Sequence, residues 1–134
     1  MNEGAATIRR LNPATMPSPY GYSQVVDVIA RRTVYLAGQV PLDEHNELVG
    51  AGDFAAQVRQ TFENVRRGLE AVGLTFDDVV KMHMYLTDMS HLLLLRDVRD
   101  EFINTASPPA STTMQVAALF RPEVMFELDV TAVG

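Results

Sequence analysis

Cysteine is absent from the 134 residues of the sequence. A chain without cysteine forms no disulfide and offers no thiolate to a metal ion, which favours a cytoplasmic protein. Long apolar runs are also missing, because no stretch approaches the ~20 residues that a transmembrane helix needs. The N-terminus, Met-Asn-Glu-Gly, has neither the cationic start nor the apolar stretch of a secretory signal. We therefore expect a cytoplasmic protein that has no membrane as a partner.

Positive charge is scarce in this chain. It has 11 Lys and Arg against 17 Asp and Glu, which gives a formal net charge of −6. This balance repels phosphate backbones, and the few basic pairs stand apart from one another, so the composition argues against nucleic acid as a partner. Hydrophobic residues make up 47% of the sequence. At this length they predict one globular domain, residues 1–134, with a sizeable core.

Two segments carry the apolar period of an amphipathic helix. The first begins after Asp53, whose carboxylate can cap free backbone N–H groups, and ends before Gly73. Its apolar residues recur every three or four positions: Phe54, Val58, Phe62, Val65, Leu69 and Val72. The second helix is predicted from a Ser90 cap to about Ile103. Its stripe consists of Leu92, Leu95, Val98, Arg99 and Phe102.

The other ordered segments are predicted to be strands. Their ranges are 7–11, 24–30, 33–40, 79–86, 112–119 and 124–133. The second and third of these flank Arg31-Arg32 and predict a hairpin. Two helices can cover only one face of a sheet of five or six strands. The predicted class is therefore α+β, a mixed sheet with both helices on one face.

The face of the sheet away from the helices is predicted to carry Tyr85, His83, Met125, Gln115 and Glu127. This set is too mixed for plain solvent-exposed surface and too polar for the core of a monomer. Contact between copies of the chain would resolve the conflict. We therefore expect self-association in a closed ring.

Several short motifs occur together in one order along nearly the whole chain. They are Tyr22-Ser23-Gln24, Leu36-Ala37-Gly38-Gln39-Val40-Pro41, Gln57-Val58-Arg59-Gln60-Thr61-Phe62-Glu63-Asn64-Val65, Phe76-Asp77-Asp78-Val79-Val80-Lys81 and Pro109-Ala110. The Gly-Gln-Val-Pro element followed by the Gln-x-x-Gln-x-x-x-Asn helix is a specific pairing. The sequence resembles the RidA family, also called YjgF or L-PSP endoribonuclease-like proteins.

The resemblance implies a chorismate-mutase-like α+β fold. It also implies a homotrimer whose sheets face an inner barrel, with ligand clefts between neighbouring subunits. The best-known members hydrolyse reactive enamine or imine intermediates to a 2-keto acid and ammonia, and they need no metal or cofactor. The expected partners are thus a small-molecule metabolite and two further copies of the chain.

The resemblance also implies a role for each matching position. Glu127, on the last strand, matches the glutamate that positions the attacking water, and it is the catalytic candidate. Tyr22 and Gly38 match residues of the cleft, and Thr113 stands where active members often carry cysteine. Ser111 stands where such members carry an arginine that binds the substrate carboxylate. The candidates for ligand binding are therefore Tyr22, Gly38, Ser111 and Thr113.

Structural roles stay open for the same residues. Glu127 can be an acceptor at an interface, beside Asp129. Tyr22 can pack under its loop, and Gly38 can serve only to let two backbones approach closely. None of the three histidines is spaced as in a metal site, so no metal is expected.

The serine at position 111 is the main departure from the pattern. A hydroxyl donates one hydrogen bond but brings no positive charge. Losing a charge-assisted hydrogen bond costs about 1.5–3 kcal/mol, which puts the hydrolysis of simple imino acids in doubt. Arg121, in the turn before the last strand, is a candidate for the missing charge, although a lone arginine in a turn is usually solvated.

Three functions remain open from the sequence. The first is hydrolysis of an enamine or imine that needs no arginine clamp. The second is metabolite binding or sensing without catalysis, which the absent arginine favours. The third and weakest is endoribonuclease activity, because the chain is acidic and shows no basic groove with aromatic residues.

Overall fold

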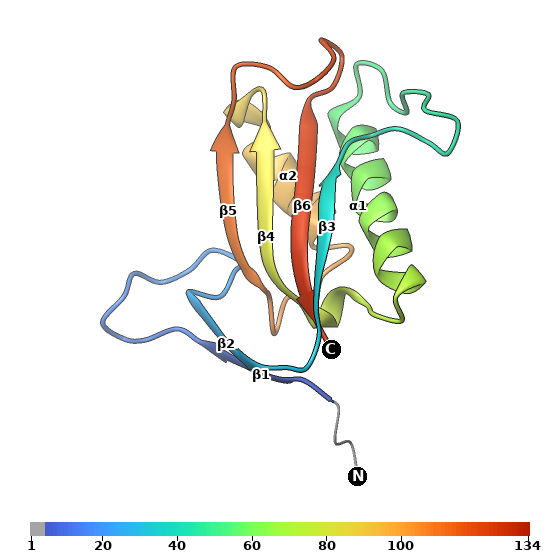
Figure 1. Ribbon diagram of the computed structural model, residues 1–134. Coiled ribbons are helices and arrows are strands. Elements are labelled where there is room, and N and C mark those ends of the chain that lie inside the picture. Colours follow the sequence, from blue (N-terminus) through green and yellow to red (C-terminus); the bar gives the residue numbers. More distant parts are fainter. Residues whose placement is uncertain (1–4) are drawn as a thin grey trace.

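The computed structural model describes residues 5–134, which form two β-sheets and two α-helices (Figure 1). The larger sheet has the strand order β3-β6-β4-β5. Its strands are β3 (Thr33–Gln39), β4 (Val79–Leu86), β5 (Ala110–Gln115) and β6 (Phe126–Val133). β4 and β5 run parallel, and the other two pairings are antiparallel. This sheet has four strands rather than the predicted five or six, because the first two strands of the chain form a sheet of their own.

The smaller sheet pairs β1 (Thr7–Leu11) with β2 (Val25–Ile29) in antiparallel fashion. The predicted hairpin between the second and third strands is therefore wrong. The reason lies at the corner between them, where Arg32 exchanges backbone hydrogen bonds with Gly134 at 3.1 and 2.9 Å. These bonds commit the start of β3 to the C-terminal strand β6, so β2 is free to turn away and pair with β1.

Helix α1 (Phe54–Ala71) agrees with the predicted helix to within one residue. Asp53 caps it as predicted, since its Oδ1 accepts a hydrogen bond from the Ala56 N–H at 3.1 Å. Gly73 follows the helix with a φ of 76°, in the left-handed region where glycine has no Cβ penalty. Both signals that fixed the ends of this helix in the sequence are confirmed.

The Gln-x-x-Gln-x-x-x-Asn motif of α1, Gln57 to Asn64, forms hydrogen bonds with the backbone of neighbouring loops. Gln57 is fully buried, and its amide nitrogen donates to the carbonyl oxygens of Gly50 and Glu123 at 3.1 and 2.9 Å. Its amide oxygen accepts the Met125 N–H at 2.9 Å. Further along, Asn64 donates to backbone carbonyls of the loop after β3. The motif thus ties the segments before α1 and before β6 to one helix face.

Helix α2 (Leu92–Arg99) is shorter than the predicted Ser90–Ile103. A 3₁₀ turn, Met89–His91, precedes it, and the cap of that turn is Asp88 rather than Ser90. The Asp88 carboxylate accepts the N–H of Ser90 at 2.9 Å. Another 3₁₀ turn, Phe76–Asp78, leads from α1 into β4.

Both helices lie on the same face of the larger sheet, as the sequence predicted (Figure 1). The core fills the space between them. Among its fully buried members are Phe62, Leu69, Met84, Leu95 and Leu128. No helix in the described part of the chain is both long and apolar enough to cross a membrane.

The opposite face of the sheet has no covering element among residues 5–134, and we call it the open face. His83, Tyr85 and Glu127 lie on it as predicted, because their neighbours along each strand are buried under the helices. Met125 and Gln115 do not. Met125 packs against the core, and the Gln115 amide oxygen accepts the N–H of Met89 at 2.7 Å on the helix side.

Candidate functional site

A cavity of about 290 Å³ lies between helix α2 and the edge strand β5. Three of the candidate residues line it: Tyr22, Ser111 and Thr113. Ser111 and Thr113 pair with Met82 and Met84 of β4, so their side chains point to the helix face of the sheet. Because β5 ends the sheet, no further strand fills the space beside it, and the core opens into a pocket.

The loop that carries Tyr22 is fixed to the start of β5. Ser23 is buried, its hydroxyl donates to the Pro108 carbonyl at 2.6 Å, and its N–H donates to the Pro109 carbonyl at 3.0 Å. These two bonds hold the tyrosine against the strand entrance that Ser111 occupies. The Pro-rich turn therefore positions one wall of the cavity.

Two arginines of α2 line the same cavity, and they were not among the predicted site residues. Arg99 is only 5% exposed, and its Nε donates to Asp100 Oδ1 at 3.0 Å. Arg96 lies with its guanidinium carbon 5.7 Å from the centre of the Tyr20 ring. Arg121, the cation suggested by the sequence, is absent from the lining and stacks over Phe120 at 5.0 Å.

Gly38 and Glu127 lie together on the open face. A Cβ on Gly38 would stand 2.9 Å from Oε2 of Glu127, so only glycine lets this carboxylate rest against β3. The register between β3 and β6 shifts between Leu36 and Gln39, which places Gly38 in a bulge. Burial raises the pKa of the Glu127 carboxyl, and the nearby negative charge of Asp129 raises it further.

A hydrogen-bonded group stands beside Glu127. Asp129 Oδ1 lies 2.8 Å from Nδ1 of His83, and its Oδ2 accepts from the Tyr85 hydroxyl at 2.9 Å. Donation to this carboxylate, together with burial, raises the pKa of Tyr85. Asp129 thus organises the polar open face and keeps negative charge close to Glu127.

The candidate residues form two groups that one subunit keeps apart. Tyr22, Ser111 and Thr113 face the helices, whereas Gly38 and Glu127 face the open side. Glu127 pairs with Tyr85, the strand neighbour of Met84, so the sheet itself separates the groups. We call the first group the cavity half-site and the second the open-face half-site.

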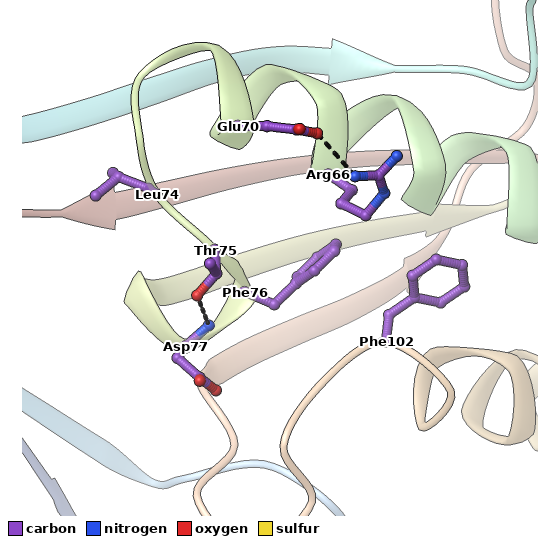
Figure 2. Close-up of a pocket in the computed structure, with 7 residues that line it drawn as sticks. All are labelled: Arg66, Glu70, Leu74, Thr75, Phe76, Asp77 and Phe102. Atoms are coloured by element: carbon purple, nitrogen blue, oxygen red, sulfur yellow. Dashed lines mark hydrogen bonds and ion pairs between the residues drawn. The ribbon is translucent and has the colours of Figure 1, made fainter.

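A larger hollow on the surface, about 430 Å³, has a different character. It lies between the end of α1 and the aromatic rings of Phe76 and Phe102 (Figure 2). Two hydrogen bonds join its polar residues: Arg66 donates to Glu70 at 2.8 Å, and Thr75 accepts the Asp77 N–H at 3.2 Å. Because its arginine is paired and none of the candidate residues lines it, we do not take it as the functional site.

The sequence profile of the family described as Endoribonuclease L-PSP matches residues 13–134. This chain belongs to that family. The Endoribonuclease L-PSP family is the one that the motifs of the sequence resembled under the names RidA and YjgF, so that prediction and the predicted YjgF/L-PSP fold are confirmed.

Relatives of this L-PSP family chain cover most of its length. Protein DfrA from Myxococcus xanthus is 38% identical over 113 residues, 84% of this chain and 85% of that one. The 2-iminobutanoate/2-iminopropanoate deaminase of Dermatophagoides farinae is 31% identical over 105 residues, 78% of this chain and 80% of that one. The crystal structure of the Rid-family protein YyfB from Yersinia pestis has a TM-score of 0.84 at 33% identity, covering 95% and 98% of the two chains.

Proposed function

We propose that this L-PSP family protein binds a small metabolite in a cleft between subunits and hydrolyses an enamine or imine there to a carbonyl compound and ammonia. The similarity to a 2-iminobutanoate/2-iminopropanoate deaminase supports this reaction class. Within the structure, a carboxylate of raised pKa on the open face and a small polar cavity on the helix face support it as well.

Glu127 carries the proposed chemistry. A carboxylate whose pKa is raised toward neutrality is a better proton acceptor than an ordinary glutamate. Glu127 takes a proton from water as the oxygen attacks the C=N carbon. It returns that proton to the nitrogen, which gives a carbinolamine. Glu127 then moves the hydroxyl proton of the carbinolamine to the nitrogen, so that the C–N bond breaks to release ammonia and leave a carbonyl. Gly38 keeps the carboxylate in place by giving it room against β3.

The separation of the two half-sites is the observation that carries the proposal. A single subunit holds them on opposite faces of one sheet, so a complete cleft needs the open face of one copy beside the cavity of another. We infer a homotrimer of single-domain subunits, residues 1–134, in which each of three clefts joins half-sites of two neighbours.

The reaction is tested by generating 2-iminopropanoate in solution and following its decay. We expect acceleration by the wild-type protein and a loss of about 100-fold or more in Glu127→Gln, which keeps the shape but cannot accept the proton. Arg59→Gln on the outer face of α1 serves as the control, since Arg59 is exposed and its one ionic partner among residues 5–134 is Glu101. A wild-type protein that leaves the decay unchanged for this imine and for longer-chain imines would contradict the proposal.

Mixing two inactive variants tests the shared cleft. Glu127→Gln damages the open-face half-site, and Thr113→Phe fills the cavity half-site. In trimers reassembled from equal amounts, about one quarter of the clefts combine two intact half-sites, so activity should return to that level. No recovery in confirmed mixed trimers would mean that both groups act within one subunit.

Binding without catalysis is the second candidate, because Ser111 stands where active relatives carry a substrate-binding arginine. Saturable binding of the metabolite without any acceleration of imine decay would favour it. We do not propose the ribonuclease activity in the family's description, since a net charge of −6 repels RNA.

A further inference from the structure

We propose that Arg96 and Arg99 of helix α2 make the cavity half-site a subsite for the carboxylate of a small monoanionic ligand. These two guanidinium groups supply, from a different element, the positive charge that position 111 lacks. The inference rests on the proposed function for the identity of this ligand as the substrate, but its test measures binding alone.

Arg99 places a buried positive charge in the wall of the cavity. Its side chain is 6% exposed, and a guanidinium stays protonated even when it is buried. Burying such a charge is costly unless hydrogen-bond partners compensate it. Asp100 Oδ1 accepts from Nε at 3.0 Å and lies 3.0 Å from Nη2. Nη1 donates no hydrogen bond to any residue from 5 to 134, so it remains available to an acceptor in the cavity.

Arg96 adds a second charge on the same helix face. Residues three apart on a helix are neighbours, so Arg96 and Arg99 reach the cavity side by side. The Tyr20 ring, 5.7 Å from the guanidinium carbon, restrains Arg96 by a cation–π contact. Two like charges so close repel each other, and an anion bound between them removes that repulsion.

The charge balance selects a monoanion. No Asp or Glu is among the described residues that line the cavity, and Asp100 neutralises one of the two arginines from outside it. One net positive charge remains, which matches a carboxylate better than a phosphate dianion. Arginine suits this ligand, because its planar fork can donate two parallel hydrogen bonds to a carboxylate.

The rest of the wall fits a short organic acid. Ser111 and Thr113 offer hydroxyls that can donate to a ligand, and Met84 and Leu95 form an apolar floor. A volume of about 290 Å³ holds roughly ten water molecules, which is enough for an acid with a short side chain.

The loop over Arg99 is shaped around the guanidinium. Gly21 has a φ of 76°, and a Cβ at this position would lie 3.2 Å from Cζ of Arg99 and closer still to Nη2. Glycine is therefore required here for the backbone conformation and for the contact. The same loop carries Tyr20 and Tyr22, which line the cavity together with both arginines.

The test is calorimetric titration of the full-length protein with 2-oxobutanoate, a stable carboxylate that resembles an imino acid, and in parallel with inorganic phosphate. We expect saturable binding of 2-oxobutanoate that weakens about tenfold or more in Arg96→Gln and in Arg99→Lys. Arg59→Gln removes the same charge at the outer surface and should leave the affinity unchanged. Arg96 is only partly buried, so Arg96→Gln should fold normally, which its melting temperature checks.

Several results would overturn the proposal. These are phosphate binding as tight as that of 2-oxobutanoate, undiminished affinity in both α2 variants, or a loss of affinity in Arg121→Gln instead. A Ser111→Arg variant that binds 2-oxobutanoate at least tenfold more tightly would show that the cavity lacks a usable cation. Binding that depends on Arg96 without imine hydrolysis would support this inference while contradicting the proposed enzyme. Imine hydrolysis together with an affinity for 2-oxobutanoate that depends on neither arginine would support the proposed enzyme and contradict this inference.

Discussion

The absence of a side chain at Gly38 in β3 determines where the Glu127 carboxylate of the neighbouring strand β6 can lie. The carboxylate rests where any other residue at position 38 would place its Cβ, 2.9 Å from Oε2 and 3.0 Å from Cδ. The crowding thus falls on the end of a flexible side chain rather than on backbone. Position 38 therefore controls where Glu127 points more than it controls whether β3 forms.

A Gly38→Ala variant separates these two effects. We expect its free energy of unfolding to change by less than about 1 kcal/mol, because Glu127 can swing away. Imine hydrolysis should fall by about 100-fold, because a displacement of 1 Å at a catalytic group can cost that much. Chemical unfolding and kinetics of the same preparation measure both quantities. A variant that loses stability but keeps its rate would assign Gly38 a purely structural role.

The raised pKa of Glu127 predicts a dependence of stability on pH. Burial and Asp129 hold the folded-state pKa above the ordinary 4.5, so in this window the native protein keeps a proton that the unfolded chain has released. The free energy of unfolding should therefore fall as pH rises from the ordinary pKa to the raised one.

Glu127→Gln should remove that slope and be the more stable protein at neutral pH. Urea unfolding of wild type and variant from about pH 4 to about pH 8 tests this, because subtraction of the two curves cancels the other titrating groups. Equal slopes for the two proteins would mean that Glu127 titrates normally.

The sequence pointed to Tyr22, Ser111 and Thr113, and the structure places these three around one cavity. The sequence pattern places Arg99 only within the apolar stripe of a predicted helix. A charged residue in a buried stripe is itself a signal, because burial of a charge is costly without a reason. Its partner Arg96 was harder to find, because only the three-dimensional packing of α2 against β5 shows that it faces the pocket.

At the scale of elements, the sequence predicted α1 well, because local signals decide where that helix begins and ends. Asp53 and Gly73 mark both ends of α1. Pairing between strands depends on distant residues, so the partner of β2 could not be predicted from alternation. The Arg32–Gly134 bonds commit β3 to β6, and β2 pairs with β1, where Arg9 and Asp27 form a cross-strand ion pair at 3.1 Å.

The buried Gln57 gives a prediction at this scale. Gln57→Leu keeps the volume but leaves the Glu123 carbonyl and the Met125 N–H without their partner, whereas the Gly50 carbonyl still accepts the Asp53 N–H. We expect a loss of about 3 kcal/mol in the free energy of unfolding, since each buried polar group left unpaired costs about 1–3 kcal/mol. Chemical unfolding measures this, with Arg59→Gln as the exposed control on the same helix. A loss no larger than that of the control would mean that water replaces the amide.

For the whole molecule, the open face is the feature that a single chain leaves unexplained. It carries the Asp129 hydrogen-bonded group and also Tyr35, a ring that is 78% exposed. Tyr35 pairs with Thr131, so it stands on the same face as Glu127. An exposed aromatic ring on the same face as a half-buried carboxylate is expected of a surface that another subunit covers.

A charge on that face should therefore dissociate the proposed trimer without unfolding the subunit. We expect Tyr35→Lys to shift the mass measured by light scattering from three chains to one, because burying an unpaired ammonium at an interface is strongly unfavourable. Its circular dichroism should stay unchanged, and imine hydrolysis should fall with the trimer, because neither half-site is complete alone.

Val72→Lys, at the far end of α1 and 37% exposed, introduces the same charge away from the open face and should leave the assembly intact. A Tyr35→Lys protein that remains trimeric would place the subunit contact elsewhere, and the two half-sites would then have no means of meeting.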